Sequence, residues 1–156
     1  MISIAKRQMT SYFIYVPRSS ANNFQLGRTK TTWGTKREAA LKELRDGDEV
    51  VFVHDITAPE PPPKGFPRVP LEQFRGTAKV LLRARVVGDP YDSTQPLWPD
   101  DIYPHRFRFE EVRHESDATI NESTLTDPER NAVRLSSVKQ GAPQAPKGIA
   151  GGPHTF

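Results

Sequence analysis

The chain of 156 residues contains no cysteine. Disulfide bonds and thiolate metal sites are therefore excluded. No apolar run approaches the roughly 20 residues that a membrane-spanning helix needs, and the N-terminus lacks the apolar core of a signal peptide. These absences predict a soluble, cytoplasmic protein that does not enter a membrane.

Sequence motifs of common catalytic centres are missing as well. The chain has no glycine-rich phosphate-binding loop and no nucleophile elbow. Pro99-Asp100 with Glu111 and Arg113 weakly resembles the pattern of metal-dependent nucleases, but arginine does not simply replace the lysine of that pattern. The four histidines lie in different contexts without metal-site spacing: His54, His105, His114 and His154. We expect no catalytic residue, no metal and no cofactor, with a nuclease built on Asp100 and Glu111 as an alternative.

Low hydrophobicity and many prolines limit the size of the folded part. Hydrophobic residues make up 35% of the chain and 15 residues are proline, so one domain accompanied by loops or a tail is expected. We assign residues 1–115 to the domain core and residues 116–139 to a C-terminal extension with a helix that packs on or near it. Residues 140–156, rich in Gly and Pro, are expected to form a flexible tail.

Four strands are predicted. Aromatic and β-branched residues that stop at Pro17 predict one over residues 11–16, and a turn at residues 46–48 precedes one over residues 49–54. Alternation of apolar and basic residues predicts strands over residues 77–87 and 105–112. Residues 17–35 are polar and irregular. Thr35 and Glu38 are spaced as a capping box and predict a short helix, and a second helix is expected over about residues 128–139. The pattern indicates an α+β fold, a curved or closed mainly antiparallel β-barrel with two or three short helices.

Basic residues are concentrated in the first 45 positions, which hold nine Lys or Arg against two Glu, whereas the remainder is net acidic. This asymmetry favours a basic face that binds a polyanion through its phosphates. A solvated basic region without a partner explains the composition equally well. The candidate phosphate contacts come from this region and from the strand over residues 105–112: Arg28, Lys30, Lys36, Arg37, Arg106 and Arg108.

The two tryptophans, Trp33 and Trp98, both fall in segments predicted to be loops. Prolines limit the freedom of the loop around Trp98, so its ring can be held in place before a ligand binds. Two indoles can cage a flat base, with about 1–3 kcal/mol gained per stacked base; alternatively, both pack as hydrophobic plugs at the barrel ends. The accompanying side chains can read a base edge or serve ordinary turns: Asn22, Asn23, Ser20 and Thr35, with Tyr91 as a further cage candidate.

The order of these motifs resembles a known family over roughly residues 10–115. Trp33-Gly34, an apolar helix face, the strand that starts at Gly47-Asp48, and the Pro96–Phe109 segment are together similar to the EVE domain, a PUA-like relative of the YTH domain. The resemblance implies a reader of modified bases, in which a flipped base enters a cage walled by Trp33 and Trp98 and Asn22 or Asn23 reads its edge.

The bacterial EVE domains with the Leu-Trp-Pro-Asp segment are similar to specificity modules of modification-dependent restriction systems, often fused to an HNH nuclease. No such module follows residue 115, so cleavage would require a separate nuclease partner. We expect a binding module for DNA that carries a modified cytosine. The alternatives are a reader of RNA, tRNA or 6-methyladenine of the YTH type, and a protein-interaction or small-ligand module.

Overall fold

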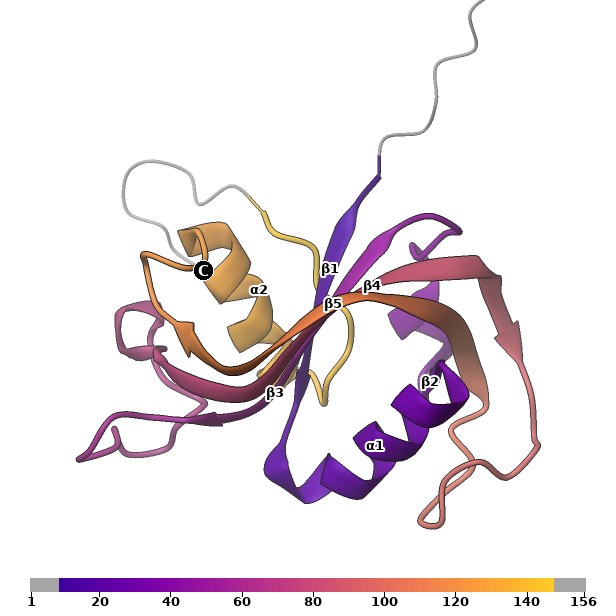
Figure 1. The fold of residues 1–156 in the computed structure, drawn as a ribbon, viewed down its shortest axis with the longest axis horizontal. Helices are drawn as coiled ribbons and strands as arrows, with labels where there is room; N and C mark the ends of the chain where they lie inside the picture. The colour runs from indigo at the N-terminus through magenta and orange to yellow at the C-terminus, as the bar shows by residue number, and fades with distance from the viewer. Residues whose placement is uncertain (1–8, 148–156) are drawn as a thin grey trace, which may run out of the picture.

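The computed structural model describes residues 9–147. Its centre is one five-stranded sheet in the order β1-β3-β4-β5-β2 (Figure 1). The strands are β1 (Ser11–Val16), β2 (Thr32–Thr35), β3 (Glu49–Thr57), β4 (Gly76–Asp92) and β5 (His105–Ile120). β1 and β3 are parallel, whereas the other neighbours are antiparallel. The predicted α+β class with a mainly antiparallel sheet is confirmed. β1 and β2 end the strand order and do not pair with each other, so the sheet is a half-barrel.

Two α-helices cover opposite faces of the sheet, α1 (Ala21–Lys30) and α2 (Asp127–Val138) (Figure 1). Successive side chains of a strand point to opposite faces of the sheet, and β3 carries buried apolar side chains on both. Val50 and Phe52 of β3 belong to the core cluster that includes Phe24 of α1. Val51 and Val53 belong to the cluster that includes Val133 of α2. The 3-10 helices are η1 (Arg18–Ser20), η2 (Glu38–Leu41) and η3 (Leu71–Gln73).

α2 begins with a capping box formed by Thr126 and Glu129. Thr126 Oγ1 accepts a hydrogen bond from the Glu129 amide at 3.2 Å, and the Thr126 amide donates to Glu129 Oε1 at 2.8 Å. This capping box satisfies two backbone donors that the helix leaves open. No helix within residues 9–147 has the length and apolarity needed to cross a membrane.

The interpretation of residues 17–35 as irregular is wrong, because this segment forms η1, α1 and β2. In α1 only Phe24 and Gly27 are buried, too few to give an apolar stripe. β2 has four residues and exists through its pairing with β5. The helix expected after Thr35 is only the one-turn η2, whose N-cap is Arg37 rather than Thr35.

Residues 140–147 of the predicted flexible tail are placed against the sheet. Phe13 and Gln144 exchange two backbone hydrogen bonds, at 2.8 and 3.0 Å, which extends the edge of β1 by an isolated bridge. The remainder of that tail, residues 148–156, lies outside the described residues, and the boundaries of the proposed domain division stay a prediction.

Candidate functional site

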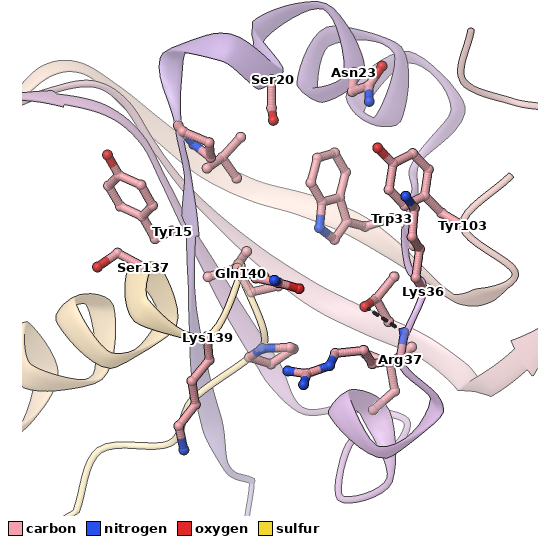
Figure 2. Close-up of a pocket in the computed structure, with 18 of the residues that line it drawn as sticks. Tyr15, Ser20, Asn23, Trp33, Lys36, Arg37, Tyr103, Ser137, Lys139 and Gln140 are labelled. Atoms are coloured by element: carbon pink, nitrogen blue, oxygen red, sulfur yellow. Dashed lines mark hydrogen bonds between the residues drawn. The ribbon is translucent and has the colours of Figure 1, made fainter. Parts of the chain in front are cut away.

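A pocket of about 440 Å³ opens between the two edge strands of the sheet, β1 and β2. One wall comes from β1 and the chain after α2, and the other from β2 and the residues that follow it (Figure 2). Further lining residues come from η1, the start of α1, the proline-rich loop at Pro67 and Arg68, and the loop that contains Trp98 and Tyr103. A curled sheet whose edge strands do not pair leaves a groove between them, and the lining here mixes apolar, polar and basic side chains. That mixture is typical of a ligand site.

Trp33 and Trp98 both line this pocket, but not as two parallel walls. Their ring centroids are 6.2 Å apart and their planes are at 81°. Tyr103 packs against Trp98 at 5.5 Å and 89°. Trp98 is 5% exposed, whereas Trp33 is half-buried. Edge-to-face contact leaves no slot between the indoles, so the three rings form a corner in which Trp33 presents itself to the pocket (Figure 2).

Two glycines allow this close packing. A Cβ on Gly27 of α1 would lie 2.8 Å from Trp33 Cε3, and a Cβ on Gly34 would lie 2.8 Å from the Tyr103 carbonyl and 3.1 Å from the Trp98 ring. The two distances of 2.8 Å are shorter than non-bonded contacts of a Cβ allow, and the one of 3.1 Å is tight. Gly27 therefore allows α1 to approach the Trp33 ring, and Gly34 allows Trp98 and Tyr103 to approach β2.

Asp100 joins the loop that contains Trp98 and Tyr103 to α1. It accepts hydrogen bonds from Asn23 Nδ2 at 2.9 Å and from the Tyr103 hydroxyl at 2.6 Å, and these bonds lower the pKa of Asp100. Burial, followed by the bond to Asp100, raises the pKa of Tyr103 to about 12. Trp98 Nε1 donates to the Asn23 carbonyl at 3.1 Å. Asn23 is thus in the pocket with part of its amide engaged by the protein.

Arg106 is buried inside the loop that contains Trp98 and binds loop carbonyls. It is 1% exposed, and its guanidinium lies 5.2 Å from the Trp98 ring centroid. It donates to the carbonyls of Tyr103 at 3.0 Å and Ile102 at 2.8 Å, and also to that of Gln95. A buried arginine needs such acceptors. The predicted phosphate contact for Arg106 is therefore not supported by its position.

The other predicted phosphate contacts divide into two groups. Lys36 and Arg37 line the pocket and are exposed; Lys36 also pairs with Asp101 at 2.6 Å, and the hydrogen bond from Lys36 lowers the pKa of that carboxyl. Arg28, Lys30 and Arg108 do not line the pocket. The guanidinium of Arg28 is held by Glu111 through two bonds of 2.9 Å.

The remaining cage candidates are also separated by the structure. Ser20, Asn23 and Thr35 line the pocket, whereas Asn22 and Tyr91 do not. Tyr91 instead lies under Arg108, whose guanidinium is 4.3 Å from its ring centroid. The lining residues that had no role in the sequence-based site include polar, basic and aromatic side chains: Tyr15, Arg68, Tyr103, Lys139 and Gln140. The aromatic loop pointed to Tyr103, but the others enter through contacts distant in sequence.

The nuclease alternative gains nothing from the geometry. Asp100 is bound by Asn23 and Tyr103, and Glu111 by Arg28. Among residues 9–147, no group of three or more His, Asp or Glu side chains is placed to hold a metal ion. The two carboxylates have structural partners instead.

No protein-family model and no curated protein matches this chain. Among solved structures it is similar to the YTH domain-containing protein mmi1 in an RNA complex, with 11% identity and a TM-score of 0.42 over 73% of this chain and 61% of that chain. The Pho92 YTH domain in complex with m6A has 17% identity and a TM-score of 0.39, over 80% and 68% of the respective chains. A hypothetical protein from Leishmania major has 15% identity and a TM-score of 0.46, over 88% and 87%. The present chain thus spans less than two thirds of the mmi1 chain.

Proposed function

We propose that this protein is a non-enzymatic nucleic-acid-binding module of the EVE type that takes one unstacked, modified base into the pocket beside Trp33. The observation that carries the proposal is the half-buried Trp33 ring, presented to a cavity of about 440 Å³ whose lining includes Asn23, Ser20 and exposed basic residues. A planar base gains stacking energy on the indole, amides and hydroxyls can pair with its edge, and cations can contact the phosphates.

The pocket must repay the cost of removing a base from its stack, which is a few kcal/mol in a duplex. Stacking on one indole supplies about 1–3 kcal/mol. A buried methyl group adds about 0.8 kcal/mol, so a methyl mark shifts affinity by only a few-fold unless the shape of the pocket adds to it. We propose a modified cytosine in DNA as the preferred ligand, with 6-methyladenine in RNA as the competing one.

The test is a binding titration at fixed salt with matched strands that carry 5-methylcytosine, 6-methyladenine or no modification, each as DNA and as RNA. We expect tightest binding to DNA with modified cytosine. Trp33→Ala should weaken binding to that strand by about 1–3 kcal/mol, roughly 5-fold to 150-fold. Tyr91→Ala removes an aromatic ring outside the pocket and should leave affinity unchanged.

Four outcomes would count against the proposal. Equal affinity for modified and unmodified strands would remove base reading, and tighter binding of 6-methyladenine RNA would replace the ligand. Equal losses in Trp33→Ala and Tyr91→Ala would place the base elsewhere. A binding constant insensitive to salt would favour a protein-interaction surface, because phosphate contacts release counterions.

A further inference from the structure

The pocket is basic on both of its walls, and the residues of the second wall were not foreseen from the sequence. Lys36 and Arg37 lie on one side, whereas Lys139 and Gln140 lie on the other (Figure 2). Arg68, from the proline-rich loop, also lines the pocket. None of the described residues that line it is Asp or Glu. Four cations line the pocket, and Asp101 pairs with one of them, Lys36, at 2.6 Å. The remaining cations give the pocket a positive potential, which attracts anionic ligands.

The chain after α2 is held in place beside the pocket. The Lys139 amide donates to the Leu135 and Ser136 carbonyls at 3.0 and 3.1 Å, and the Gly141 amide donates to the Ser136 carbonyl at 2.8 Å. Gly141 has a φ of 80°, which suits glycine at a helix C-terminus. Further on, Gln144 pairs with Phe13 of β1. The backbone is thus held by hydrogen bonds at Lys139 itself and at Gly141 and Gln144 beyond it. The Lys139 side chain is exposed.

The proline-rich loop is anchored as well. The Arg68 amide donates to the Gly65 carbonyl at 2.8 Å. Next to it, Val69 is 5% exposed, and Phe66 stacks on Phe74 with ring centroids 5.7 Å apart. The Arg68 side chain is exposed, and no ion pair of Arg68 or Lys139 is found within residues 9–147. Both cations are available to a ligand.

We infer that Arg68 and Lys139 bind the backbone phosphate on one side of the inserted base, while Lys36 and Arg37 bind the phosphate on the other side. This inference rests on the proposed function and refines its substrate class. A free nucleotide carries phosphate on one side only and engages one wall, whereas an internal nucleotide of a strand carries a charged linkage on each side. The ligand is therefore an internal nucleotide of a polynucleotide strand.

The experiment combines single variants of the full chain with strands in which one phosphate is neutral. Three strands carry the same modified base. The first has ordinary linkages, the second has an uncharged methylphosphonate linkage on the 5′ side of that base, and the third has the methylphosphonate linkage on its 3′ side. The variants are Arg68→Gln, Lys139→Gln and Arg37→Gln. Lys64→Gln, in the same proline-rich loop, and Lys147→Gln, in the same C-terminal segment, are matched controls because neither residue lines the pocket.

We expect Arg68→Gln and Lys139→Gln each to weaken binding of the ordinary strand several-fold. Each should also reduce the slope of log affinity against log salt, by up to about 0.7, the value for one phosphate of a single strand, because the two side chains share one phosphate. The loss should vanish on one of the two neutralised strands, the same strand for both variants. The loss in Arg37→Gln should vanish on the other strand.

Affinities of Arg68→Gln and Lys139→Gln that match those of Lys64→Gln and Lys147→Gln would overturn the inference. Losses that persist equally on both neutralised strands would also overturn it. If wild-type preference for the modified base survives in either case, only the two-wall assignment fails. Absence of that preference in the wild-type protein identifies failure of the proposed function itself.

Discussion

Residues of one type have different roles here because their surroundings differ. Arg106 and Arg37 were both predicted to contact phosphates. Arg106 is 1% exposed and donates to three loop carbonyls, whereas Arg37 is exposed at the pocket. A guanidinium has five donors and must satisfy them when it is buried. Burial therefore assigns Arg106 to loop structure and leaves Arg37 for a ligand.

His54 provides a test at the same scale. It is 4% exposed, its Nδ1 lies 3.0 Å from the Val16 carbonyl, and its ring is 4.8 Å from Phe24. Burial lowers the pKa of His54; the Val16 bond and Asp55 oppose this effect and Lys79 adds to it. The unfolded chain therefore takes up a proton first as pH falls through about 6.5. We expect the free energy of unfolding to be at full value above that pH and to decline below it.

Urea unfolding between pH 7.5 and 5.5 measures this decline, in a window above the titration of ordinary carboxyls. His54→Gln should flatten the profile by about 1.4 kcal/mol for each unit by which the pKa is lowered. His114→Gln, at an exposed position, should keep the wild-type profile. A slope retained in His54→Gln would show that other groups cause it.

At the scale of elements, the loop before β5 depends on β2 for its position. Ser93 and Pro104 are joined by a backbone hydrogen bond of 2.9 Å, and between them Trp98 packs on Gly34. Asp100 then ties the loop to α1 through Asn23. The aromatic corner is therefore a property of three elements, and a change in any of them should move it.

Gly34→Ala tests that dependence. Its Cβ would lie 2.8 Å from the Tyr103 carbonyl and 3.1 Å from the Trp98 ring, so overpacking should cost about 1–3 kcal/mol and shift the tryptophan fluorescence. Gly88→Ala is the control: it has open space but a φ of 78°, and should cost about 1 kcal/mol through backbone strain without changing the fluorescence. Unchanged fluorescence in Gly34→Ala would mean that the loop does not rest on β2.

At the scale of the whole molecule, an incomplete barrel creates the site. β1 and β2 are the two ends of the strand order, and the pocket lies between them. α2 and the segment after it cover part of the β1 edge: the Tyr15 amide donates to Ser136 Oγ of α2 at 2.9 Å, and Gln144 of the following segment pairs with Phe13. The same segment supplies Lys139 and Gln140 to the pocket. Completion of the sheet edge and of the site are thus coupled.

Comparison of a chain ending at Lys147 with a chain ending at Lys139 tests this coupling. The shorter chain loses both backbone bonds between Phe13 and Gln144, each worth about 0.5–1.5 kcal/mol. We expect its free energy of unfolding to fall by about 1–3 kcal/mol, measured by urea titration, and its affinity for a modified strand to fall as well. Equal stability of the two chains would show that the bridge contributes nothing.

Local pattern alone determined the long strands and α2. The predicted strand over residues 11–16 is β1 residue for residue, and the other three predicted strands all lie on observed ones. Alternation and helix capping act between residues a few positions apart, so one sequence suffices to detect them. The convergence of Trp33 and Trp98 was also expected from the sequence.

The tertiary structure alone decided the geometry of the site. α1 is held by contacts of Phe24 with Trp33 and Phe52, and β2 by its pairing with β5. The spacing of apolar residues within each segment does not reveal these contacts. The perpendicular tryptophans follow from Gly34 and Tyr103, which are 69 positions apart in sequence. Arg68 and Lys139 reach the pocket because their loops pack against α2 and β1. Burial and partner choice depend on contacts between distant segments, and these decide which basic side chains remain open to a ligand.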